Sequence, residues 1–113
     1  MDDVRRVLIT GATGFAGGYL GAHLAGAYPG WQVVGTTRHA AQADSRFIRC
    51  DLRDAAAVAS LIEQVTPEMV VHLAGQSNVP ASLKDPETTL ANNILGTLHL
   101  LDACRTHVPQ SRL

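Results

Sequence analysis

This sequence has no large excess of charge of one sign and no long apolar run. Nine Lys and Arg residues against ten Asp and Glu leave a formal net charge of −1. Nucleic-acid and anionic-membrane binders usually carry a clustered basic excess. No apolar run approaches the roughly 20 residues that span a bilayer, and residues 1–6 do not resemble the start of a secretory signal. We therefore expect no nucleic acid and no membrane as partners, and a cytoplasmic location.

Cysteine and metal-ligand patterns are also scarce. Cys50 and Cys104 lie far apart and form no Cys-x-x-Cys pair, which excludes a disulfide framework. None of the five histidines has the His-x-x-x-His spacing of many zinc sites, so no metal is expected. The composition, 46% hydrophobic and 17% charged, is that of an ordinary globular chain, and 113 residues predict one domain over 1–113.

Apolar periodicity predicts strands that alternate with helices. Strands are predicted at 4–10, 31–36, 47–50 and 69–74, and helices at 15–27, after Asp54 and after Asp85. Both aspartates are predicted N-caps, and the last helix is expected to carry its apolar face through Ile94, Leu98, Leu101 and Val108. This alternation indicates a parallel sheet with right-handed crossovers and helices on its faces. A fifth strand is expected after Leu113.

A glycine-rich loop joins the first predicted strand directly to the first predicted helix. It reads Thr10-Gly11-Ala12-Thr13-Gly14-Phe15-Ala16-Gly17. Glycines let the chain turn sharply and bring backbone N–H groups close to phosphates, and the helix N-terminus adds partial positive charge. We predict a pyrophosphate-binding loop, with a plain structural turn as the alternative.

The Gly-x-x-Gly-x-x-Gly spacing and the preceding threonine resemble the extended short-chain dehydrogenase/reductase family, the NAD-dependent epimerases and dehydratases. Three further segments match in order: Asp51-Leu52, His72-Leu73-Ala74-Gly75 and Asn93-Ile94-Leu95-Gly96-Thr97. The resemblance covers essentially the whole chain. It implies an α/β fold with a Rossmann-type, doubly wound parallel sheet of four strands in the order 3-2-1-4, incomplete because the fifth strand onward is missing.

The same resemblance implies a dinucleotide site, with Asp51 against the adenine ring and the segment His72–Gly75 against the cofactor. The implied cofactor-binding residues are Gly11, Thr13, Gly14, Phe15, Ala16, Gly17, Arg38, Asp51, Leu52, Leu73, Ala74, Gly75 and Asn93. Two alternatives stay open: Asp51 caps a turn, or Asn93 is an ordinary polar helix residue. We expect His72 to be satisfied by packing, without a chemical role.

The end of the second predicted strand bears on the choice between NADP and NAD. Enzymes that prefer NAD usually carry an acidic residue there, which binds the ribose 2′-hydroxyl. This sequence reads Thr36-Thr37-Arg38-His39 and has no acid until Asp44. A guanidinium suits a 2′-phosphate, so we predict NADP, with NAD as the alternative. In the competing interpretation Arg38 is a solvated cation that stacks on adenine without selecting a phosphate.

The segment His-Leu-Ala-Gly-Gln-Ser-x-Val-Pro, followed by Lys-Asp-Pro, is similar to the GDP-6-deoxy-D-mannose reductases. GDP-mannose 4,6-dehydratases share much of the pattern, and UDP- or dTDP-sugar epimerases and dehydratases are further alternatives. The resemblance implies a nucleotide-sugar substrate, GDP-linked by preference, whose 4-keto group is reduced by hydride transfer. The implied substrate-binding residues are Gln76, Ser77 and Asn78. In the alternative interpretation, Ser77 and Asn78 only cap the loop.

The sequence departs from the family at its catalytic pair, Tyr-x-x-x-Lys. Tyr19 and Tyr28 are followed four residues later by His23 and Gln32, and the only lysine is Lys84. A tyrosine needs a nearby cation to act as a base near neutral pH. We therefore expect an N-terminal cofactor-binding half that is inactive alone, of a longer enzyme that forms a homodimer. The alternative is a non-catalytic NADP-binding module.

Overall fold

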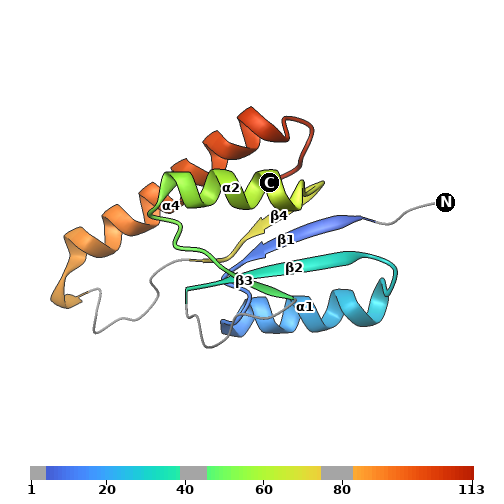
Figure 1. Cartoon of the computed structure of the whole chain (residues 1–113). Helices are drawn as coiled ribbons and strands as arrows, with labels where there is room; N and C mark the ends of the chain where they lie inside the picture. The colour runs from blue at the N-terminus through green and yellow to red at the C-terminus, as the bar shows by residue number, and fades with distance from the viewer. Residues whose placement is uncertain (1–4, 39–45, 75–82) are drawn as a thin grey trace.

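Four parallel strands form one sheet in the computed structural model, which describes residues 5–38, 46–74 and 83–113. The strands are β1 (Arg6–Thr10), β2 (Gln32–Thr37), β3 (Phe47–Arg49) and β4 (Met69–His72). Their order is β3-β2-β1-β4 (Figure 1). Leu8 of β1 lies opposite Val34 of β2 and Val70 of β4. The predicted order and the parallel pairing are therefore confirmed.

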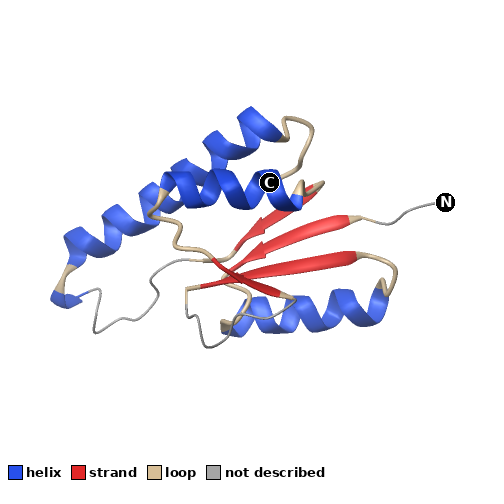
Figure 2. Cartoon of the chain, viewed as in Figure 1, coloured by secondary structure: helices blue, strands red, loops and turns tan. Residues whose placement is uncertain are grey.

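Helices within the described residues cover the two faces of this sheet (Figure 2). They are α1 (Phe15–Ala27), α2 (Ala55–Val65) and α4 (Pro86–His107). Helices α2 and α4 pack against each other on one face, and α1 covers the opposite face. A parallel sheet with helices on both faces is the doubly wound arrangement that the alternation predicts.

The alternating side chains of β1 divide the core into two layers. Leu8 points to the side of α2 and α4, where it joins Val58, Ile62 and Leu100. Val7 and Ile9 point to the other side and pack with Leu24 of α1. Both layers are fully buried at β1, as expected for a central strand that is covered on both faces.

Side-chain caps start the two helices on the same face. Asp54 Oδ1 accepts hydrogen bonds from the backbone N–H groups of Ala56 and Ala57 at 3.1 and 3.2 Å. Asp85 Oδ1 accepts one from Thr88 at 3.1 Å. These bonds satisfy N–H groups that have no partner inside the helix. The two predicted N-caps are confirmed.

The predicted apolar face of α4 was wrong. Ile94, Leu98 and Leu101 are 55, 48 and 46% exposed, although Val108 does pack against the core. The helix instead buries the row Gly96, Leu100, Ala103 and Cys104. Because α4 has apolar residues on two sides, its periodicity does not select one of them. Packing against α2 does, and it buries Leu100 with Val58 and Ile62.

The last residues of the chain lie beside β4. Arg112 forms a parallel bridge with Met69, in which its N–H donates to Glu68 O at 3.0 Å and its carbonyl accepts from Val70 N–H at 2.7 Å. This bridge lies on the outer edge of β4, where a fifth strand is predicted. None of the helices in the described residues is long and apolar enough to cross a membrane.

We predict that Asp54→Ala lowers the free energy of unfolding by about 1 kcal/mol, because two N–H groups of α2 lose their acceptor. Denaturant titration monitored by circular dichroism measures the change. Gln64→Ala, on the exposed side of the same helix, is the matched control and should stay within about 0.5 kcal/mol of the wild type. Equal effects of the two substitutions would contradict the assigned cap.

Candidate functional site

A pocket of about 450 Å³ opens at the carboxyl ends of the strands, between the glycine-rich loop and the first half of α4. This is the edge at which doubly wound sheets bind ligands. The pocket collects all the described residues of the predicted cofactor-binding set: Gly11, Thr13, Gly14, Phe15, Ala16, Gly17, Arg38, Asp51, Leu52, Leu73, Ala74 and Asn93. The other predicted site residues, Gly75, Gln76, Ser77 and Asn78, lie outside the described residues.

Two glycines let the loop pack closely against its surroundings. Gly11 has a φ of +68°, and a Cβ there would lie 2.8 Å from the backbone nitrogen of Ala74. A Cβ on Gly17 would lie 2.8 Å from Ala12 Cα. Both contacts are with backbone atoms, which cannot rotate away as a side chain can. The loop therefore requires glycine at 11 for its conformation and at 17 for space.

The N-terminus of α1 has no side-chain cap. Its N-cap residue is Gly14, and its first turn contains no acidic residue. Both other helices begin with a capping aspartate, Asp54 or Asp85. The first residues of α1 line the pocket, so the helix presents backbone N–H donors and partial positive charge to it. Such an end is suited to an anion.

Asp51 is held by Arg53 at the rim of the pocket. Arg53 Nη2 donates to Asp51 Oδ2 at 2.7 Å, and Arg53 Nε donates to Oδ1 at 3.0 Å. The backbone N–H of Arg53 also donates to Oδ1, at 3.0 Å. These bonds, the side-chain bond above all, lower the pKa of Asp51 to about 2. Asp51 is therefore a carboxylate at neutral pH, and Arg53 neutralises its charge.

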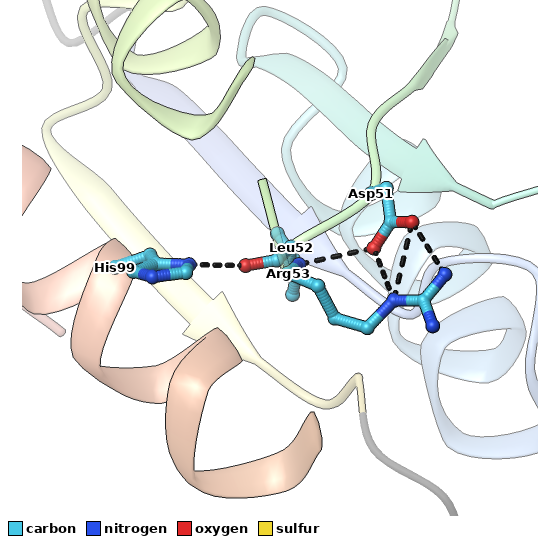
Figure 3. A network of polar contacts seen from close by, with 4 residues as sticks. All are labelled: Asp51, Leu52, Arg53 and His99. Atoms are coloured by element: carbon cyan, nitrogen blue, oxygen red, sulfur yellow. Dashed lines mark hydrogen bonds and ion pairs between the residues drawn. The ribbon is translucent and has the colours of Figure 1, made fainter. Parts of the chain in front are cut away.

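Figure 3 shows how this pair joins the wall of the pocket. The Arg53 side chain turns back onto Asp51, and His99 of α4 approaches Leu52 from the opposite side. His99 Nδ1 donates to the carbonyl oxygen of Leu52 at 2.7 Å. The segment that follows β3 is thus fixed by an ion pair on one side and by α4 on the other.

Arg38 follows β2 directly and lines the pocket with an exposed side chain. Its charge contributes to lowering the pKa of Asp51, so the two side chains are within electrostatic reach. Asp51, with Arg53 as its partner, is the acid on this side of the pocket among the described lining residues. The local charge of Arg38, Asp51 and Arg53 together is positive.

Several residues outside the predicted cofactor-binding set also line the pocket: Thr36, Thr37, Cys50, Arg53, His72, Asn92 and Gly96. Most lie at the carboxyl ends of strands or within or beside a matched motif, as His72 and Gly96 do, and position alone could have suggested them. Burial, with Asp51 and Asp54 adding to it, raises the pKa of the Cys50 thiol to about 11, which makes Cys50 a poor nucleophile. The described residues contain no group of three or more side chains placed to hold a metal ion.

Comparison with known proteins connects this pocket to a family. The model of the NAD dependent epimerase/dehydratase family matches residues 7–113. The chain is similar to GDP-6-deoxy-D-mannose reductase of Pseudomonas aeruginosa, with 37% identity over 89% of this chain and 30% of that protein. It is also similar to GDP-mannose 4,6-dehydratase of Vibrio cholerae, with 30% identity over 89% of this chain and 31% of that protein. The chain thus spans about 30% of the length of these relatives.

Solved structures agree on the fold. UDP-glucose 4-epimerase of Thermus thermophilus, in complex with NAD, superimposes with a TM-score of 0.78 and 34% identity over 90% of this chain and 34% of that chain. UDP-glucose 4-epimerase of Brucella ovis, also in complex with NAD, has a TM-score of 0.76 and 33% identity over 90% of this chain and 32% of that chain.

We predict that Gly17→Ala destabilises the protein while Gly18→Ala does not. The added methyl group at position 17 meets the backbone of Ala12, whereas a Cβ at position 18 meets nothing within 4 Å. Overpacking of this kind costs roughly 1–3 kcal/mol, and alanine in an open helix position gains about 0.5–1 kcal/mol over glycine. Thermal unfolding of both variants tests the prediction, and similar melting temperatures would contradict the close contact at Gly17.

Proposed function

Because the chain belongs to the NAD-dependent epimerase/dehydratase family, we propose that its pocket binds a nicotinamide dinucleotide. The observation that carries the proposal is the glycine loop, whose close packing leads into the uncapped N-terminus of α1. The pyrophosphate would accept hydrogen bonds from the backbone N–H groups there, as anions do at helix N-termini. Asp51, Leu52 and Arg53 would border the adenine side, and the end of β4 the nicotinamide side.

Within that site we propose NADP as the preferred cofactor and NAD as the alternative. Arg38 stands where an NAD enzyme would place a carboxylate, and its guanidinium can bind a 2′-phosphate through two parallel hydrogen bonds. Arg53 supports the proposal because it neutralises Asp51, the nearest acid among the described lining residues. The two epimerase structures described above are NAD complexes, so a direct comparison of the two cofactors is needed.

For the whole protein we propose reduction of a GDP-linked 4-keto-6-deoxy sugar. The Pseudomonas relative bears the name of a GDP-6-deoxy-D-mannose reductase, and the sequence Gly75–Asn78, which follows β4 in the chain, resembles this group. The bound cofactor supplies the hydride, and the protein supplies orientation and exclusion of water. Gln76, Ser77 and Asn78 are proposed to contact the sugar. A GDP-mannose 4,6-dehydratase, or a UDP- or dTDP-sugar epimerase or dehydratase, is the alternative enzyme.

A non-catalytic NADP-binding module is the alternative from another functional class. Such a module needs no Tyr-x-x-x-Lys, and residues 1–113 contain none. The coding sequence after Leu113 separates the two proposals. A further strand followed by Tyr-x-x-x-Lys supports the enzyme, whereas a stop codon supports the module.

We also propose that the whole protein forms a homodimer. The apolar side chains Leu90, Ile94, Leu98 and Leu101 of α4 are 46 to 61% exposed and follow one another at helical spacing. An apolar row of this kind is typical of a surface that is covered in an assembly.

We predict that Arg38→Asp weakens NADPH binding much more than NADH binding. The substitution removes a charge-assisted contact with the 2′-phosphate and adds repulsion, which should cost about 2 kcal/mol or more, roughly 30-fold in affinity. Calorimetric titration with both cofactors measures the ratio. Arg5→Asp is the control. It makes the same change in charge just before β1, at the end of the strand away from the pocket. An unchanged NADPH/NADH ratio in Arg38→Asp would overturn the proposed role of Arg38.

We predict that residues 1–113 alone do not turn over substrate. Without the family's tyrosine and lysine, general acid catalysis worth about 10² to 10⁴ in rate is lost, and substrate positioning adds to the loss. The purified chain is incubated with NADPH and a GDP-4-keto-6-deoxy sugar while absorbance of the reduced nicotinamide is followed. Turnover above the enzyme-free control that disappears in Gly14→Val would show that the catalytic groups lie within these residues.

A further inference from the structure

We propose that His72 is a positioning residue that, in its neutral Nε2–H form, ties the ends of β1 and β4 and helix α4 together beneath the dinucleotide. The proposal rests on the proposed function, because it concerns how tightly the pocket holds that ligand. His72 is the last residue of β4, half-buried, and pairs with Thr10 of β1 in the sheet register. It lines the pocket and begins the matched segment His72–Gly75, in which no role was predicted for its side chain.

Both ring nitrogens of His72 have a partner from a different element. Nδ1 lies 2.7 Å from Thr10 Oγ1, and Nε2 lies 3.0 Å from Thr97 Oγ1 on α4. Thr10 Oγ1 also accepts hydrogen bonds from the backbone N–H groups of Leu73 and Ala74, at 3.0 and 3.1 Å. The ring therefore connects a residue just before the glycine loop with a residue in the middle of α4.

The surrounding donors and acceptors select one protonation state. A threonine hydroxyl has one donor and two acceptor positions. Both acceptor positions of Thr10 Oγ1 are used by N–H groups, of which that of Leu73 is shared with the Thr10 carbonyl oxygen at 3.2 Å. The hydroxyl proton therefore points to His72 Nδ1, which must be unprotonated. The Thr97 hydroxyl donates to Asn93 O at 3.0 Å, so it accepts from His72 Nε2–H. Every group in the chain of contacts is satisfied when His72 is the neutral Nε2–H tautomer.

Protonation of His72 breaks this arrangement. A proton on Nδ1 would point at a Thr10 oxygen that already accepts two hydrogen bonds, and one of these bonds must then be given up. Burial acts in the same direction, since it lowers the pKa of His72 below its usual value. The neutral form is complete above the ordinary histidine pKa of about 6.5 and is lost as the pH falls through the lowered pKa.

Among the charged and titratable groups around the pocket, His72 is the one whose protonation we expect to change in mild acid. Burial is the cause of the His72 shift, with no contribution from a charged neighbour on β1 or α4. Residues 75–82, which follow in the sequence, contain no ionisable side chain. At the opposite rim Asp51 has a pKa of about 2 and Cys50 one of about 11, and the bonds from Asp51 raise the pKa of Arg53 above its usual value. His99, which contacts Leu52, is the other histidine near the pocket wall and needs a control.

The bonds made by Thr10 reach the phosphate loop directly. Leu73 and Ala74, which Thr10 Oγ1 holds, are the residues against which Gly11 packs, with 2.8 Å between Ala74 N and the position of a Gly11 Cβ. A displaced Ala74 therefore displaces Gly11, the first residue of the loop. On the other side, Thr97 connects the ring to Asn93, which lines the pocket. Loss of the neutral His72 ring therefore loosens both the glycine loop and the α4 wall of the pocket.

The test measures dinucleotide affinity by calorimetry between about pH 7.5 and 5.5. Oxidised NAD is titrated beside oxidised NADP, because the 2′-phosphate of NADP itself gains a proton near pH 6. His72→Asn keeps an acceptor for the Thr10 hydroxyl but cannot be protonated, and His72→Ala removes both contacts. His99→Asn removes the other nearby histidine, and His23→Asn, on the exposed side of α1, is the distant control.

In the wild type the affinity for NAD should fall with acid, by up to about tenfold per pH unit below the pKa of His72, because one proton is linked to binding. The fall should disappear in His72→Asn, which should bind more tightly than His72→Ala at pH 7.5, and should persist in His99→Asn and His23→Asn. An acid-induced fall that is unchanged in His72→Asn, or equal binding by the Asn and Ala variants, would overturn the positioning role.

A second measurement needs no ligand. Long-range ¹H–¹⁵N correlation spectra of the wild-type chain at pH 7.5 should show the proton of His72 on Nε2, and the amide signals of Leu73 and Ala74 should move as His72 titrates. An Nδ1–H tautomer, or amides that do not move, would contradict the network itself. If the spectra agree but neither dinucleotide binds at pH 7.5, the proposed function fails and the positioning role fails with it, while the network stands.

Discussion

The structure depends on one close backbone contact, where the chain leaves β1 at Gly11 and passes the chain leaving β4 at Ala74. No side chain fits there, since a Cβ on Gly11 would lie 2.8 Å from Ala74 N, and the positive φ of Gly11 directs the chain into the turn. On the other side of the loop, Gly17 of α1 packs equally closely against the backbone of Ala12. The two adjacent strand ends and the start of the helix are thereby brought to one edge of the sheet, where the pocket lies.

The charges around this pocket follow from how each helix begins. Helices α2 and α4 each use an aspartate to bind their own N–H groups, whereas α1 begins at a glycine and leaves its N–H groups to face the pocket. Arg38 adds a cation at the end of β2, and Arg53 cancels the charge of Asp51. An anionic ligand thus meets favourable potential on the loop side and little repulsion on the other. The arrangement suits a dinucleotide better than a neutral ligand.

Local patterns predicted the elements of the fold well, because each depends on neighbours in the sequence. Asp54 and Asp85 cap the helices they precede, and the alternation of strands and helices predicted the parallel sheet, whose strand order came from the family resemblance. The predicted set of cofactor residues also converges on one pocket as far as it is described. The face of α4 was not predictable, because Leu98 and Leu100 are equally apolar and packing against α2 alone distinguishes them.

By itself the sequence determined the glycine loop, the order of the elements and the position of Arg38, since these depend on residue type and spacing within a few residues. Tertiary structure decided which side chains meet. Thr10 and His72 are 62 residues apart, and His72 and Thr97 are 25 apart. The protonation state of the His72 ring therefore cannot be predicted from the sequence, because these residues meet only in the folded sheet. Arg53 lies two residues from Asp51, yet its bidentate pairing depends on the chain direction after β3. The distances and angles of the folded structure decide which of these hydrogen bonds form, and residue spacing in the sequence does not specify them.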